Sequence, residues 1–111
     1  MDDSQRRKAA NEAVFRHVNE QIDDLRRRFA TVSDGLLHIV CECDRVDCAE
    51  PLDVEIAVYE RVRADAACFF VTPGHEDTTV ETVVDSGRNF LVVRKRPGEP
   101  QRIAEETDPR R

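Results

Sequence analysis

The clearest hydrophobic pattern in the chain lies near its N-terminus. Apolar residues recur there at alternating steps of three and four positions, namely Phe15, Val18, Ile22, Leu25, Phe29 and Val32. This spacing predicts a helix over about residues 4–32 with an apolar seam along one face. The seam allows two interpretations: the helix packs on the protein's own sheet, or it pairs with another helix. The residues predicted for self-association are Phe15, Val18, Ile22, Leu25 and Phe29.

An aliphatic and β-branched run over residues 36–43 predicts the first strand of the body. Side chains alternate between the two faces of a strand. One face therefore carries two aliphatic residues and two cysteines, Leu37, Ile39, Cys41 and Cys43. The opposite face carries His38 and Glu42.

The remaining apolar runs predict a second, shorter helix and more strands. Residues 52–54 and 55–65 fit a short strand followed by a helix. Residues 68–72 form a compact apolar run, and the runs 79–84 and 89–95 flank a turn, which predicts an antiparallel hairpin. The expected fold class is therefore α+β, with a long N-terminal helix packed on or beside a small, mostly antiparallel sheet and a short second helix.

Length and composition are those of one small domain. The chain has 111 residues, of which 36% are charged and 5% aromatic, so its core must be small and aliphatic. We expect a single domain over residues 1–96, with its body at 36–96. Residues 97–111 are polar and contain three prolines, which predicts a flexible tail. A domain of this size often needs a metal or another cross-link for stability.

Charge and hydropathy argue against two classes of partner. The net charge of −6 does not favour general binding to nucleic acid or to an anionic membrane. Contact with nucleic acid or the transcription machinery stays an alternative because of three short basic clusters at 6–8, 26–28 and 94–96. No run reaches the roughly 18 apolar residues of a membrane span, and no apolar signal segment follows the polar start. We therefore expect a cytoplasmic protein.

Three of the four cysteines lie within residues 41–48, in the sequence CECDRVDC. In a reducing compartment such a cluster favours a metal site or a redox switch over a structural disulfide. Cys41 and Cys43 point to one side of a strand, where both thiolates can reach a single ion. Cys48 follows on a polar loop that can fold back to supply a third ligand. A tetrahedral zinc ion requires a fourth.

His75 is the best candidate for the fourth ligand. It follows Pro73 and Gly74, which together favour an extended residue and then a sharp turn at the end of a strand. The sequence therefore predicts a zinc-binding loop and a closed structural Cys3His site formed by Cys41, Cys43, Cys48 and His75. His38 is the second candidate for the fourth ligand, although it lies on the opposite strand face.

Other metal-binding residue types have simpler interpretations. Cys68 lies among apolar residues and is expected to be a small buried hydrophobe. Asp44 and Asp47 are expected to keep the cysteine loop soluble. His17 is expected to be exposed on the first helix.

Five motifs run through nearly the whole chain: NEAVFRHVNE (11–20), CECDRVDC (41–48), YERVR (59–63), PGHE (73–76) and DPR (108–110). Together they resemble a family of small bacterial proteins with no established activity. The pairing of CEC with PGHE is the most specific part of the resemblance. It implies that the three cysteines and His75 belong to one set, and it implies no reaction.

A binding module fits these features better than an enzyme. The chain has four glycines and no Gly-rich phosphate loop, and a closed Cys3His site leaves no open position for catalysis. We expect a small zinc-stabilised module for protein interaction or regulation, acting on a protein partner or as a homodimer through the N-terminal helix. The alternatives are the nucleic-acid contact above and a thiol redox sensor that uses Cys41 and Cys43.

Overall fold

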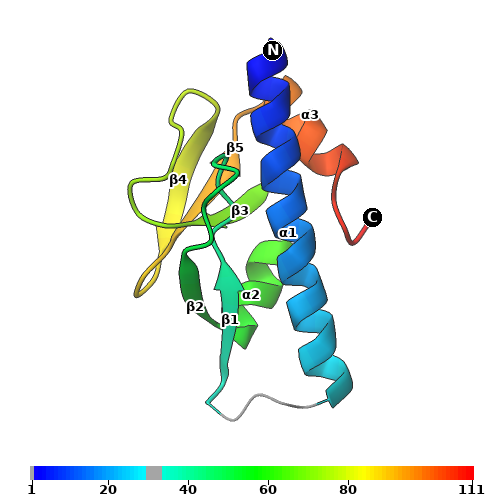
Figure 1. Cartoon of the computed structure of the whole chain (residues 1–111), viewed down its shortest axis with the longest axis vertical. Coiled ribbons are helices and arrows are strands. Elements are labelled where there is room, and N and C mark those ends of the chain that lie inside the picture. The colour runs from blue at the N-terminus through cyan, green and yellow to red at the C-terminus, as the bar shows by residue number, and fades with distance from the viewer. Residues whose placement is uncertain (1, 30–33) are drawn as a thin grey trace.

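A long N-terminal helix lies beside two small antiparallel sheets in the computed structural model, which describes residues 2–29 and 34–111 (Figure 1). In chain order the elements are α1 (Asp3–Phe29), β1 (Leu36–Val40), β2 (Pro51–Glu55), α2 (Ile56–Arg63), β3 (Cys68–Val71), β4 (Glu81–Ser86), β5 (Leu91–Lys95) and α3 (Glu99–Glu106). The predicted α+β class is confirmed. The predicted residues 30–32 of the first helix, including Val32, lie outside the described residues.

The strands form two sheets, whereas the sequence predicted one. β1 pairs with β2, and the second sheet has the order β3-β5-β4. The chain leaves β1 at Val40 and turns toward β3, where the Glu42 amide donates a hydrogen bond to the Phe70 carbonyl at 2.7 Å. The loop after β1 therefore lies against β3, and this contact joins the two sheets next to the cysteines.

An aliphatic and aromatic core fills the space between the sheets and α2. Phe70 lies at its centre, stacked on Tyr59 with ring centroids 5.6 Å apart and meeting the edge of Phe90 at 5.5 Å. Gly87 makes the last contact possible, because a Cβ atom there would lie 2.2 Å from the Phe90 ring. The core is small, as the composition predicted.

α1 packs on the body mainly through polar side chains, and only part of its apolar seam takes part. Its buried residues are Glu12, Arg16, Asn19 and Asp23. Arg16 is fully buried and donates hydrogen bonds to the carbonyls of Ala66 at 2.6 Å and Ala104 at 2.7 Å. Most of the buried polar groups of α1 thus have hydrogen-bond partners, although Arg16 Nε has none.

As a result, only some residues of the predicted seam are packed against the body, and the others are exposed. Phe15 and Ile22 are half-buried, and Ile22 packs against the core. Val18, Leu25 and Phe29 remain exposed. The predicted helix does lie beside the protein's own sheet, in contact with β1. Only part of the seam faces the body, because a neighbouring polar face of the helix occupies most of the contact.

The C-terminal residues differ from the expected flexible tail over 97–111. Pro100 lies in the first turn of α3, where a missing amide costs no hydrogen bond. Ala104 is buried, and Figure 1 shows α3 beside the upper part of α1. Beyond α3, the Arg110 guanidinium pairs with Glu20 and, at 2.9 Å, with Glu60. The domain therefore includes the C-terminal residues, which hold α1 against α2.

Over the residues described, no helix combines the length and apolar content that crossing a membrane requires.

Candidate metal centre

Four side chains from two loops converge where the end of β1 meets the end of β3. Cys41, Cys43 and Cys48 lie on the cysteine loop (residues 41–50) between β1 and β2, and His75 lies on the loop after β3. The ligand atoms of all four lie within 4.8 Å of one another. The structure therefore brings together the full set that the sequence predicted.

The distances between these atoms fit a tetrahedral ion. His75 Nδ1 lies 3.7 Å from Cys41 Sγ and 3.6 Å from Cys48 Sγ. Metal bonds of about 2.3 Å to sulfur and about 2.0 Å to nitrogen at tetrahedral angles separate the two ligand atoms by about 3.5 Å. The side chains are thus already at ligand spacing, and Nδ1 is the ring nitrogen that faces the thiols.

Short-range backbone hydrogen bonds hold the two loops in shape. The Cys41 amide donates to the Glu50 carbonyl at 2.9 Å and closes the cysteine loop at its base. The His75 amide donates to the Thr72 carbonyl at 2.9 Å across a turn in which Gly74 has a φ of 94°, a conformation that favours glycine. The Pro-Gly pair therefore presents the imidazole as the sequence predicted.

Burial and hydrogen bonding set the chemistry of the thiols. Cys41, Cys43 and Cys48 are all buried. Loss of solvation raises the pKa of the Cys41 and Cys43 thiols, although the Thr72 amide donates a hydrogen bond to Cys41 Sγ at 3.1 Å. These thiols are therefore protonated at neutral pH unless a metal ion displaces the protons, so metal affinity must rise with pH.

Glu42 is a site residue whose burial the alternation pattern did not reveal. Its side chain, which alternation places on the face opposite the cysteines, is fully buried. The carboxylate accepts hydrogen bonds from Arg63 at 2.5 Å, the Phe70 amide at 2.9 Å and Asn19 at 2.8 Å. It therefore fixes the segment between Cys41 and Cys43, which follows β1, to α1, α2 and β3.

The other candidate ligands lie elsewhere. His38 is exposed on β1 and its Nδ1 lies 2.7 Å from Asp53, so the structure favours His75 and not His38 as the fourth ligand. Cys68 is buried in the core, and His17 is exposed on α1, both as predicted. Asp47 is exposed on the cysteine loop.

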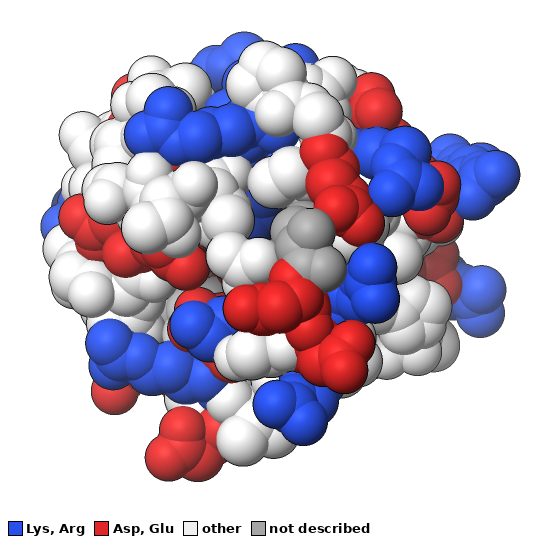
Figure 2. All heavy atoms as spheres, turned by 90° about the horizontal axis from the view of Figure 1, so that it is seen from above, with Lys and Arg blue, Asp and Glu red and all other residues white. Residues whose placement is uncertain are grey.

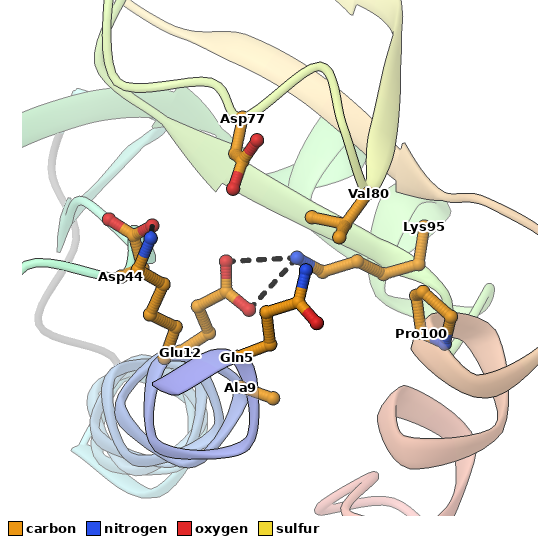
Figure 3. A pocket seen from close by; sticks show the side chains of 9 residues that line it. Gln5, Ala9, Glu12, Asp44, Asp77, Val80, Lys95 and Pro100 are labelled. Carbon is orange, nitrogen blue, oxygen red and sulfur yellow. Dashed lines mark hydrogen bonds and ion pairs between the residues drawn. The ribbon is translucent and has the colours of Figure 1, made fainter. Parts of the chain in front are cut away.

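A small pocket lies between α1, the cysteine loop and the loop after β3 (Figure 3). Lys95 Nζ lies 2.9 Å from both carboxylate oxygens of Glu12 at its floor, and Asp44 and Asp77 lie on its other side. Burial raises the pKa of Glu12 to about 7, with Lys95 acting in the opposite direction. The cavity volume of about 20 Å³ is that of about one water molecule. The pocket is therefore a buried ion-pair site that docks α1.

No protein-family model matches the chain, and comparisons with curated proteins and with solved structures return no match. The resemblance to the bacterial family described above therefore stays a prediction.

Proposed function

We propose that the chain is a zinc-stabilised binding module in which Cys41, Cys43, Cys48 and His75 hold one structural zinc ion. The observation that supports this proposal is the spacing of the donors, with His75 Nδ1 at 3.7 and 3.6 Å from two cysteine sulfurs. Three thiolates and one imidazole are a donor set that suits zinc, whereas magnesium and calcium require oxygen ligands.

A structural role follows from the ligand count and from the position of the site. Four protein ligands complete a tetrahedral zinc and leave no position for a reacting water. The ion would join the cysteine loop of the β1–β2 sheet to the loop that follows β3 of the second sheet. In a chain with so small a core, this link would contribute directly to the free energy of folding. We therefore propose a binding protein and not an enzyme.

The chemistry of the thiols supports a metal site over a redox sensor. A reactive cysteine needs a lowered pKa and exposure to solvent. Burial instead raises the pKa of Cys41 and Cys43, and the described cysteines are all free. A cytoplasmic location would keep these thiols reduced and available to the metal.

The charge distribution supports a protein partner over nucleic acid. Two of the three basic clusters are neutralised by carboxylates, since Arg26 and Arg27 pair with Asp23 and Lys95 pairs with Glu12. Figure 2 shows blue and red side chains interspersed over the face seen from above, without a continuous basic patch. Binding to a phosphate backbone depends on such a patch. The surface that fits a protein partner best is the exposed apolar part of α1.

Elemental analysis of the protein purified without added metal or chelator tests the metal proposal. We expect about one zinc per chain, and we expect His75→Ala to lower both the zinc content and the thermal midpoint. His38→Ala is the matched control, because it removes an exposed histidine of the same sheet region and should retain the metal. A wild-type protein without zinc, or a His75→Ala variant that binds it as tightly, would contradict the proposal.

A further inference from the structure

One face of α1 carries four exposed apolar side chains in two pairs, which no described part of the chain covers. They are Val14, Val18, Leu25 and Phe29, which are 60%, 37%, 54% and 67% exposed and are called the apolar strip below. At 100° per residue they fall within about 60° of the helix circumference, and they extend over about 22 Å of its length. Scattered exposed apolar residues are ordinary, but several on one face of a helix are typical of an interaction surface.

The spacing of the apolar strip is symmetric about the middle of the helix. Val14 and Phe29 are equally distant from the point between Gln21 and Ile22, and so are Val18 and Leu25. If two copies of α1 run antiparallel with a two-fold axis at this point, Val14 lies at the level of Phe29 of the partner subunit. Val18 likewise lies at the level of Leu25 of the partner subunit. Each smaller side chain then meets a larger one, as a self-complementary interface requires.

The polar residues beside the strip fit the same arrangement. His17, Gln21 and Asp24 are exposed along one flank of the helix, and Asp24 pairs with Arg28 at 3.1 Å. In the antiparallel pair, Asp24 lies between the levels of Gln21 of the partner subunit and His17 of the partner subunit. The two Asp24 carboxylates therefore do not meet, and each has a potential donor on the opposite helix. Charge and apolar pattern thus point to the same register.

We infer that α1 is a self-association surface through which two copies of the chain pair antiparallel about a two-fold axis between Gln21 and Ile22. The inference rests on the binding role of α1 in the proposed function, and it does not depend on the metal. The apolar strip is exposed because α1 packs on the body through its polar face. Glu12, Arg16 and Asn19 are buried on that face, and the apolar strip therefore faces solvent. A strip of four side chains is smaller than a standard interface, so we expect association that is weak and depends on protein concentration.

Sedimentation velocity of the zinc-loaded full chain between about 1 and 200 µM tests the inference, because weak association depends on protein concentration. The wild type should shift from monomer to dimer. Leu25→Glu and Val18→Lys should each raise the dissociation constant at least about tenfold, because each places a charge opposite an apolar side chain. Val84→Glu is the matched control, since Val84 is also an exposed valine, 52% accessible, but lies on β4. Circular dichroism would verify that each variant is folded.

The double variant Val18→Lys/Leu25→Glu tests the direction of pairing. In the antiparallel arrangement each new lysine lies opposite a new glutamate of the other copy, so dimerisation should be regained relative to both single variants. In a parallel arrangement like charges would meet, and the double variant would stay monomeric. A monomeric wild type at the highest concentration, a Leu25→Glu variant that dimerises normally, or a double variant that remains monomeric would overturn the inference.

Zinc content measured on the same samples separates the two proposals. A monomer that holds one zinc per chain would overturn self-association and leave the metal centre standing. A dimer without zinc would overturn the metal centre and leave self-association standing.

Discussion

The orientation of a single imidazole ring decides how the proposed ion is held. His75 Nδ1 faces the thiols, while Nε2 lies 3.3 Å from the Arg45 guanidinium. A zinc ion on Nδ1 leaves the proton on Nε2. Two hydrogen-bond donors, Nε2–H and the guanidinium, would then face each other, so the Arg45 side chain must turn away when the metal binds. We expect a long-range proton–nitrogen NMR spectrum of the zinc protein to show a protonated Nε2 and a metal-bound Nδ1. A spectrum with these roles exchanged would contradict the geometry.

Glu12 is a second residue whose environment makes a measurable prediction. Burial raises its pKa from 4.5 to about 7, so the folded protein binds a proton more tightly than the unfolded chain does. Its contribution to stability is therefore fully present below about pH 4.5 and is lost as the pH rises through about 7. Within this window the free energy of unfolding should fall by at most about 1.4 kcal/mol per pH unit.

Urea unfolding with excess zinc between about pH 5.5 and 8 measures this slope. Glu12→Gln removes the titrating group and should flatten the pH dependence relative to wild type. Glu55→Gln changes an exposed glutamate and should keep the wild-type slope. Equal slopes in wild type and Glu12→Gln would show that Glu12 does not titrate in this range.

At the scale of single residues, the sequence identified the ligands but not their support. Cys41, Cys43 and Cys48 are close in sequence, and the Pro-Gly turn before His75 is a local signal, so both could be interpreted from spacing. Glu42 could not, because its burial depends on Arg63 and on the Phe70 amide, which reach it through the tertiary fold.

At the scale of elements, local patterns predicted the strands, the hairpin and α2, whose observed bounds Ile56–Arg63 lie inside the predicted 55–65. They failed for the docking face of α1. Hydrophobic periodicity assumes that the apolar side of a helix is the buried side. Here the buried side carries polar and charged side chains whose partners come from β5, α3 and the cysteine loop, so no local pattern could have revealed it. The helix α3 was missed as well, because its sequence is mostly polar and its packing depends on the tertiary fold.

Arg16 tests how much this polar docking contributes. Arg16 is fully buried. Its guanidinium donates hydrogen bonds to the carbonyls of Ala66 and Ala104 and lies 4.4 Å from the centre of the Phe69 ring. Arg16→Ala would remove the side-chain donor to Ala66 and the closest donor to Ala104 and would open a cavity, at a cost of about 2–4 kcal/mol in the free energy of unfolding. Arg28→Ala removes an exposed arginine of the same helix and should cost less than about 1 kcal/mol. Comparable losses in urea unfolding would mean that the Arg16 contacts contribute little.

At the scale of the whole molecule, the metal centre lies at the contact between the two sheets. The β1–β2 sheet has two strands, which alone are marginally stable in water. The other sheet has three strands and carries Phe70 and Val93 of the core. The proposed ion would therefore stabilise the two-stranded sheet more than the three-stranded one, because the smaller sheet has less packing of its own.

Removal of zinc should thus destabilise the region around the metal centre before it unfolds the whole domain. After chelation at neutral pH, we expect amide hydrogen exchange to accelerate first in the cysteine loop, β1 and β2, while β3 and β5 keep most of their protection. The physical reason is that Cys41 and Cys48 would lose their link to His75, whereas the β3–β5 pairing contains no ligand. Readdition of zinc should restore the original pattern, which excludes irreversible oxidation as the cause. A uniform loss of protection across both sheets would instead show that the ion stabilises the domain as one cooperative unit.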